Sequence, residues 1–246
     1  MTLFYGNVFA LSDPILISIS PEMKNIVLDG KWTFFSEWKP TSLSYIVNDD
    51  KQIILRTAHY ENFIYIFIDS VNDFTLDHEL DTAIICFDGE NNKNKIPDQN
   101  DFCFLSTLGN SHGIIYQGNS TNVHSNYFQK ISASSNFIAI STVSDENDRY
   151  TDIPHPGFEF KIPTDIIQRS DNYGFFVSVY DSSSNIFFTY PEILQDDISV
   201  IPSPQKWGDL ISPDKSLPEL HYPIMIFLIV MSSLIIFQSK LSIAKF

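Results

Sequence analysis

The run FIYIFI at residues 63–68 decides the fold class, and the run AIICF at residues 83–87 has the same character. A strand with one face in water alternates apolar and polar side chains, but these two runs are apolar on both faces. They therefore predict β-strands that are covered on both sides, in the middle of the molecule. By contrast, residues 158–162 alternate as FEFKI, which predicts a strand with one polar face.

Outward from these runs, the sequence between residues 25 and 212 has the character of β-structure throughout. No stretch of 12 residues has apolar side chains at the spacing of an amphipathic helix. Short runs rich in Ile, Val, Phe, Tyr and Thr are instead separated by Asn, Asp, Ser, Gly and Pro. About eleven strands with hairpin-length links predict an all-β fold, a two-sheet antiparallel β-sandwich, rather than a parallel α/β fold. We expect these strands near residues 25–29, 51–58, 62–69, 80–88, 101–108, 112–117, 136–143, 157–162, 174–181, 185–190 and 207–211.

Composition excludes several classes of protein. The 246-residue chain is 43% apolar and 14% aromatic, which excludes an intrinsically disordered protein. Its formal charge of -15 argues against nucleic acid as a partner, because phosphate binding needs clustered Lys and Arg. Only two cysteines are present, which excludes a disulfide-rich scaffold and a multi-cysteine zinc site.

The C-terminus differs from the rest of the chain. Residues 223–237 read PIMIFLIVMSSLIIF, without a charge, and are followed by Lys240 and Lys245. The apolar run, extended by a lysine that reaches the interface, is long enough for a membrane span. We therefore expect a stalk at residues 213–222 and one transmembrane helix with a short basic tail at residues 223–246. A buried core helix is the alternative.

Charge predicts the orientation of this anchor. Without its two C-terminal lysines the chain is strongly acidic, whereas the tail carries no acidic residue. By the positive-inside rule the tail is cytoplasmic and the bulk of the chain lies outside a cell membrane. The segment Pro218-Glu219 before the apolar run also resembles C-terminal sorting tails that surface enzymes cleave, so the tail is either retained or processed.

The N-terminus resembles the end of a secretory signal. Val8-Phe9-Ala10 has small or modest residues at the -3 and -1 positions of a cut after Ala10. A basic n-region is missing and the apolar stretch is short. We interpret residues 1–24 as a truncated signal remnant and a lead-in, with a first β-strand as the alternative.

Acidic side chains are concentrated in one window, residues 69–101, which also holds many asparagines and a long loop, DGENNKNKIPDQND, at residues 88–101. Crowded carboxylates repel one another unless they are solvated or bind a cation. Hard oxygen ligands at loop ends suit calcium. The spacing is not that of an EF-hand, and a solvated acidic loop is the alternative to a calcium site.

The sequence contains no convincing catalytic motif. The six histidines are scattered, without the His-Glu-x-x-His pattern of a zinc protease helix. No Gly-x-Ser-x-Gly elbow and no Gly-rich phosphate loop is present. We therefore expect a protein that is not an enzyme. An enzyme with a buried acid in a cleft, or a zinc site built from distant histidines, is the weaker alternative.

Cysteines and tryptophans leave alternatives open. Cys86 and Cys103 lie on expected strands that flank the long loop, so they form either a disulfide or two buried thiols. Trp32 and Trp38 are expected in a hydrophobic cap, and Trp207 is either a sugar-stacking platform or a core residue. A glycosylation sequon lies at residues 119–121.

Several motifs follow one another in the order found in a known family. They comprise residues 26–30 (IVLDG) with Trp38, residues 60–69, residues 79–88, residues 157–163 (GFEFKIP), residues 173–181 and residues 206–210 (KWGDL). Together, over residues 25–212, they resemble the family nine carbohydrate-binding modules, within a wider DOMON-like group of jelly-roll sandwiches. No single motif is specific, and their order carries the resemblance.

This resemblance implies a β-sandwich with calcium bound near the acidic loops. The ligand candidates that it suggests are Asp81, Asp88, Asp98 and Asp101. The family clamps sugar between two tryptophans, but here His78 holds one of these places and no aromatic residue holds the other. Among the residues of this chain, His78, Tyr190 and Trp207 are the candidates for a ligand-binding site.

The sequence therefore predicts a non-catalytic, surface-exposed domain that binds a glycan or another surface polymer, stabilised by calcium. The main alternative is a structural or adhesive cell-envelope protein without a small-ligand site. A haem carrier, known among DOMON-like relatives, needs a Met or His axial ligand, and residues 25–212 contain no methionine.

Overall fold

The computed structural model describes residues 12–121, 127–193, 201–212 and 231. The chain divides into two units, Met1–Pro213 and Asp214–Phe246. Most of the signal remnant, the stalk and the transmembrane helix expected from the sequence lie outside the described residues. Within the part that is described, no helix has the length and apolar character that crossing a membrane requires.

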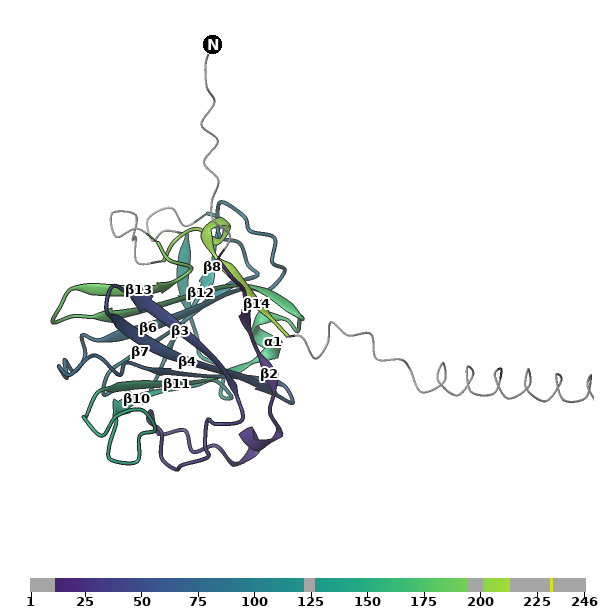
Figure 1. Cartoon of the computed structure of the whole chain (residues 1–246). Coiled ribbons are helices and arrows are strands. Elements are labelled where there is room, and N and C mark those ends of the chain that lie inside the picture. The colour runs from purple at the N-terminus through teal and green to yellow at the C-terminus, as the bar shows by residue number, and fades with distance from the viewer. Residues whose placement is uncertain (1–11, 122–126, 194–200, 213–230, 232–246) are drawn as a thin grey trace, which may run out of the picture. The chain divides into compact units, whose positions relative to one another are not determined.

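The first unit is a sandwich of two β-sheets (Figure 1). One sheet has the strand order β1-β14-β12-β6-β7-β8-β9, with β13 paired to β12, and the other has the order β10-β11-β5-β4-β2, with β3 paired to β4. The strands are β1 (Ile15–Leu16), β2 (Ser18–Ile19), β3 (Ser42–Asn48), β4 (Lys51–Tyr60), β5 (Phe63–Asp69), β6 (Thr82–Asp88), β7 (Asp101–Thr107), β8 (Ile114–Gly118), β9 (Phe128–Ile131), β10 (Ile138–Val143), β11 (Pro156–Pro163), β12 (Asn172–Asp181), β13 (Ile186–Tyr190) and β14 (Gly208–Ile211). Short helices are η1 (Pro21–Asn25), α1 (Thr164–Ile167) and η4 (Pro204–Lys206).

Most neighbouring strands are antiparallel, as predicted, and two short N-terminal strands are the exceptions. β1 pairs with β14 and β2 pairs with β4 in parallel. The segment at residues 1–24, expected as a lead-in, thus contributes an edge strand to each sheet. The predicted all-β, two-sheet sandwich is confirmed.

The core between the sheets is built from alternate residues of the central strands. From β5, Ile64, Ile66 and Ile68 face inward, and from β6, Ile85 and Phe87 do so. The residues between them also have buried side chains, because each sheet has a second apolar cluster on its outer face. This explains why these strands are apolar on both faces.

The outer cluster of the six-stranded sheet lies under the segment before β3, drawn in purple in Figure 1. Trp32 and Trp38 are fully buried there, and Trp38 stacks on Phe67 of β5 at 5.4 Å between ring centroids. This confirms the hydrophobic cap predicted for the two tryptophans. The segment is fixed by Glu159 of β11, which accepts hydrogen bonds from the backbone of Gly30 and from the indole of Trp38.

The outer cluster of the eight-stranded sheet contains the two cysteines. Cys86 of β6 and Cys103 of β7 face each other in register and form a disulfide. Trp207 packs on the same face, stacked on Phe176 at 6.4 Å. Of the two alternatives for the cysteines, the structure shows the disulfide.

The strand predicted at residues 25–29 is wrong. Residues 21–25 form the 3-10 helix η1, and the following residues pair with no strand. The N–H of Val27 donates to the Glu37 carboxylate, and those of Asp29 and Gly30 donate to Glu159. Side-chain carboxylates thus replace the strand partner that an apolar run would otherwise need. Conversely, β3 and β9 were missed by the sequence analysis.

Candidate functional site

A pocket of about 440 Å³ opens at one end of the sandwich. Three turns meet there: the one between β4 and β5, the one before β10, and helix α1 with the residues that follow it. The pocket is lined by Asn62, Phe63, Asn136, Pro163, Thr164, Asp165, Gln168 and Arg169. One aromatic ring, three side-chain amides and two opposite charges therefore surround one concave surface.

Two of the three segments around this pocket, the β4–β5 turn and the α1 segment, are tied to each other. The backbone N–H of Thr164 donates to the carbonyl of Asn62 at 2.9 Å, and Arg169 donates to the Asn62 side chain at 3.4 Å. The ammonium of Lys161 lies 4.1 Å from the centroid of the Phe63 ring. Gln168 has φ 59° and ψ 145°, a region that residues other than glycine rarely adopt. The strained backbone of Gln168 stands at the rim of the pocket.

None of the three ligand-binding candidates from the sequence lines this pocket. Trp207 is only 4% exposed, and its indole donates to the carbonyl of Pro202. The hydroxyl of Tyr190 donates to the backbone of Asp209, close to Trp207. His78 is exposed in the loop between β5 and β6, before the start of β6. The structure thus brings Tyr190 and Trp207 near each other and leaves His78 apart.

The four predicted calcium ligands divide between the two ends of β6. Asp81 directly precedes Thr82 at the start of the strand, whereas Asp88 ends it. Asp88 lies opposite Asp101 in the pairing of β6 with β7. Asp98 belongs to the same end, because its backbone N–H donates to Asp101 at 2.7 Å. Seven residues of strand span about 23 Å, so one ion cannot bind both groups.

Asp88 and Asp101 form a buried pair of carboxylates. Both residues are fully buried, and one carboxylate oxygen of each has no hydrogen-bond partner. The side-chain oxygen of Asn91 is buried and unpartnered as well. A Cβ on Gly174 would come within 2.7 Å of the Asp88 Cβ and within 3.2 Å of the Asn91 oxygen, so the glycine lets both side chains pack closely against β12. Asp88, Asp101 and Asn91 would supply the hard oxygen ligands that calcium takes.

Electrostatics at this end of β6 also favour a cation. Burial raises the pKa of Asp101 to about 8, and the negative charge of Asp88 adds to the rise. Lys93 is near, but its ammonium lies 3.2 Å from Asp209 and donates to the carbonyl of Trp207. A divalent cation would remove the mutual repulsion of the buried carboxylates.

Asp81 belongs to a second acidic cluster, with Asp73 and Asp181, whose oxygens lie within 4.8 Å of one another. Here the carboxylates already accept hydrogen bonds from the surrounding loops. Asp73 accepts from Thr75, and Asp81 accepts from the backbone N–H of Ser182. Lys51 lies 3.4 Å from Asp181. This cluster is therefore better compensated than the Asp88–Asp101 pair.

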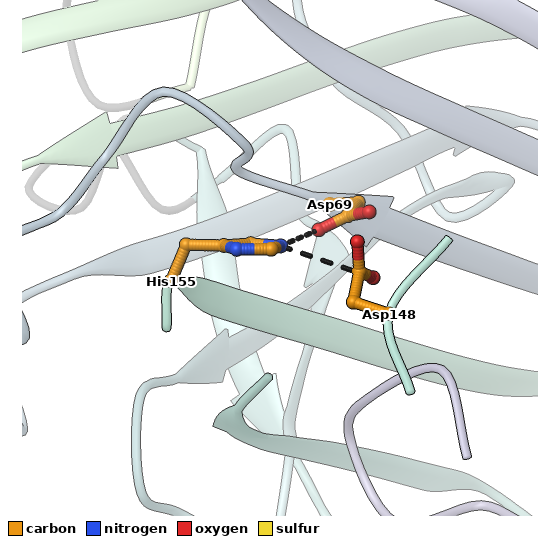
Figure 2. Close-up of side chains that lie close together, drawn as sticks. All are labelled: Asp69, Asp148 and His155. Atoms are coloured by element: carbon orange, nitrogen blue, oxygen red, sulfur yellow. Dashed lines mark hydrogen bonds and ion pairs between the residues drawn. The ribbon is translucent and has the colours of Figure 1, made fainter. Parts of the chain in front are cut away.

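A third cluster joins Asp69, Asp148 and His155 (Figure 2). All three side chains are at most 1% exposed. The His155 ring nitrogen Nε2 lies 2.5 Å from Asp69 Oδ1 and 3.9 Å from Asp148 Oδ2. Burial raises the pKa of Asp69 to about 6 although the hydrogen bond to His155 opposes the rise. Burial lowers the pKa of His155, but the hydrogen bond and charge of Asp69, the Ile153 carbonyl and the charge of Asp148 together raise it, and the net shift is upward.

Sequence reasoning missed the pocket and the histidine cluster for the same reason. Each is assembled from segments far apart in the chain: Asp69 and His155 are 86 residues apart, and Asn62 and Arg169 are 107 apart. One signal was present, because Asp69 ends the most apolar strand of the chain. A carboxylate at the end of such a strand is buried unless the strand frays.

Comparisons with known proteins gave matches among solved structures. No protein-family model matches the chain, and no curated protein does. A family nine carbohydrate-binding module from Caldicellulosiruptor kristjanssonii in complex with cellotriose has a TM-score of 0.46 and 13% identity, over 81% of this chain and 93% of that one. The same kind of module in complex with glucose has a TM-score of 0.46 and 14% identity, over 81% and 95%.

Proposed function

We propose that this protein is a non-catalytic carbohydrate-binding domain and that the pocket beside α1 is its sugar site. The composition of the pocket carries the proposal. A sugar hydroxyl both donates and accepts hydrogen bonds, and side-chain amides can do both in return. Asp165 adds a negatively charged acceptor and Arg169 a positively charged donor. Phe63 supplies apolar surface for the C–H face of a ring. The order of family motifs along the sequence supports the same function.

The pocket is suited to a chain end or a short oligosaccharide rather than to a large polymer surface. Its volume is at the lower end of the range for small-molecule sites. The hydrogen bonds among Thr164, Asn62 and Arg169 hold the β4–β5 turn against the α1 segment before a ligand arrives. Such preorganisation lowers the entropic cost of binding.

The full-length chain is expected to bind sugar in titration calorimetry with glucose, cellotriose and then the best ligand from a glycan array. Arg169→Ala with Asn136→Ala should weaken the affinity by about 10–100-fold, since a hydrogen bond to a charged group contributes roughly 1.5–3 kcal/mol. Both side chains are exposed, so the fold should persist.

Arg149→Ala is the matched control, because Arg149 is an exposed arginine over Phe35, outside the pocket. It should leave the affinity unchanged. Sugar binding that survives the pocket variant would place the site elsewhere, with Tyr190 and Trp207 next to be tested. A well-folded chain that binds no sugar would favour the structural or adhesive envelope protein.

We further propose that calcium stabilises the domain at the Asp88–Asp101 pair. Adding calcium to chelator-treated protein should raise the melting temperature. At a hundredfold excess of calcium over Kd, the free energy of unfolding should increase by about 3 kcal/mol. Asp101→Asn should remove this response, while its amide oxygen still accepts from Asp98.

Asp81→Asn is the control at the other end of β6 and should keep the calcium response. The reverse pattern would move the ion to the cluster of Asp73, Asp81 and Asp181. A wild-type chain that melts cooperatively at the same temperature with calcium and with chelator would contradict a calcium site altogether.

We also propose an extracellular position on a cell membrane, single-pass, with a C-terminal anchor. The support for this proposal is the sequence: the uncharged run at residues 223–237 and the two lysines after it. The disulfide between Cys86 and Cys103 agrees with an oxidising compartment.

A further inference from the structure

The cluster of Asp69, Asp148 and His155 joins two parts of the six-stranded sheet. Asp69 is the last residue of β5, and His155 immediately precedes β11. Asp148 lies in the connection between β10 and β11. Among the described residues, no lysine or arginine forms an ion pair with either carboxylate. Two buried acids therefore share one imidazole as their neighbour.

Both ring nitrogens of His155 face hydrogen-bond acceptors. Nδ1 lies 2.7 Å from the carbonyl oxygen of Ile153, which can only accept, and 2.9 Å from the Ser144 hydroxyl. Nε2 lies 2.5 Å from Asp69 Oδ1, a hydrogen-bond distance, and 3.9 Å from Asp148 Oδ2. A metal ion bound at Nε2 would take the place of the proton that lies between this nitrogen and the carboxylates.

The two carboxylates are oriented toward that same point. Asp148 Oδ1 accepts from the backbone N–H groups of Tyr150 and Thr151, at 2.8 and 3.1 Å, which fixes the carboxylate. Its other oxygen, Oδ2, is buried without a hydrogen-bond partner, and so is Asp69 Oδ2. Fully buried oxygens without partners are costly, and they are rare unless a proton or an ion compensates them.

One proton on the ring leaves a net charge of about -1 among three side chains that are at most 1% exposed, which is unfavourable. A divalent cation with two carboxylates and a neutral imidazole sums to zero. The Nδ1–H bond to the Ile153 carbonyl is also the outer contact that metal-binding histidines make in proteins.

We propose that Asp69, Asp148 and His155 bind a divalent transition-metal ion of the zinc class. One ligand atom from each residue lies within 4.8 Å of the other two, so small side-chain shifts bring them around one ion. The ligand set of one nitrogen and carboxylate oxygens suits zinc, whereas calcium takes oxygen ligands. This site is separate from the proposed calcium site and does not depend on sugar binding.

The ion would hold the β10–β11 connection against the end of β5. That connection carries Tyr150, whose ring meets Trp32 edge-on at 5.9 Å and whose hydroxyl accepts from Arg56. The metal is therefore placed to stabilise the outer cluster over the six-stranded sheet. Because the three ligand side chains are at most 1% exposed, the role of the ion would be structural rather than catalytic.

The test uses full-length protein stripped with chelator and titrated with zinc alone, in competition with a coloured zinc indicator. We expect one tight equivalent and a higher melting temperature. Cobalt(II) in place of zinc should give visible absorption bands typical of a site with a nitrogen ligand. This spectrum is measured on the wild-type chain, so it does not depend on whether a variant folds.

Asp148→Asn is the decisive variant, because its side-chain oxygen can still accept from Tyr150 and Thr151 while the second carboxylate oxygen is lost. It should weaken zinc binding at least tenfold. His112→Gln, which changes an exposed histidine outside the cluster, should leave the tight equivalent intact. No tight zinc equivalent and no cobalt bands, in a wild-type chain that melts cooperatively, would overturn the proposal. Tight binding that Asp148→Asn does not weaken would overturn it as well.

Discussion

Replacing Glu159 with glutamine is expected to reduce the fall in stability that the wild-type domain shows as the pH rises. Burial raises the pKa of Glu159 from 4.5 to about 8, while the hydrogen bonds from Gly30 and Trp38 oppose the rise. Between these two pH values the unfolded chain loses the proton and the folded chain keeps it. Folding then takes up a proton, so stability decreases with pH in this window and levels off above it.

Glu159 is expected to contribute a loss of about 3–5 kcal/mol in the free energy of unfolding between pH 4.5 and 8, at roughly 1.4 kcal/mol for each pH unit. Urea unfolding at several pH values, with metal-free protein, measures it for the wild type and for Glu159→Gln. The amide cannot satisfy every donor that the carboxyl meets, so the variant should be less stable at low pH. That deficit is independent of pH, and only the difference in slope reports on Glu159.

Equal slopes in the two proteins would mean that Glu159 is ionised in the folded state at all pH values tested. Its three N–H donors would then outweigh burial. Asp69 and Asp101, whose pKa values are also raised, contribute the same slopes to both proteins and cancel in the comparison.

Trp38→Ala is expected to lower the free energy of unfolding by about 3–5 kcal/mol. The indole is fully buried, stacks on Phe67, and donates to Glu159 at 2.8 Å. Its removal leaves a cavity under the cap and a buried carboxyl with one donor fewer. Since a domain of ordinary stability has about 5–15 kcal/mol in total, this one change removes a large share.

Trp38→Phe is the matched variant for this prediction. It keeps an aromatic ring on Phe67 and loses the N–H donor, so it should cost about 1–3 kcal/mol. Urea unfolding measures both variants. A Trp38→Ala loss no greater than that of an exposed control, Phe35→Ala, would contradict a stabilising cap, since Phe35 is 72% exposed.

Much of the fold could be predicted from the sequence because β-structure leaves a local pattern. The runs at residues 63–68 and 83–87 are apolar at every position, and that pattern needs cover on both faces wherever the strands lie. The alternation at residues 158–162 was a less reliable guide to solvent exposure, because Glu159 on the predicted polar face of β11 is fully buried. The alternation shows which side chains are polar, whereas their burial depends on which segment covers that face of the sheet.

The acidic residues of the candidate calcium site were predictable in part. Crowding of carboxylates identified the acidic window, and the family resemblance suggested Asp81, Asp88, Asp98 and Asp101 within it. The pairing of β6 with β7 places Asp88 opposite Asp101. The length of β6 separates Asp81 from Asp88 and Asp101, because an extended strand has a large rise per residue.

The sequence by itself determined the β-sandwich, the cap of Trp32 and Trp38, and a surplus of acid near residues 69–101. Each follows from side-chain chemistry repeated within a few residues. Only the tertiary structure decided the disulfide, the pocket beside α1 and the cluster of Asp69, Asp148 and His155. These features depend on which distant turns and strand ends meet, and that is set by strand pairing and by the packing of the whole domain.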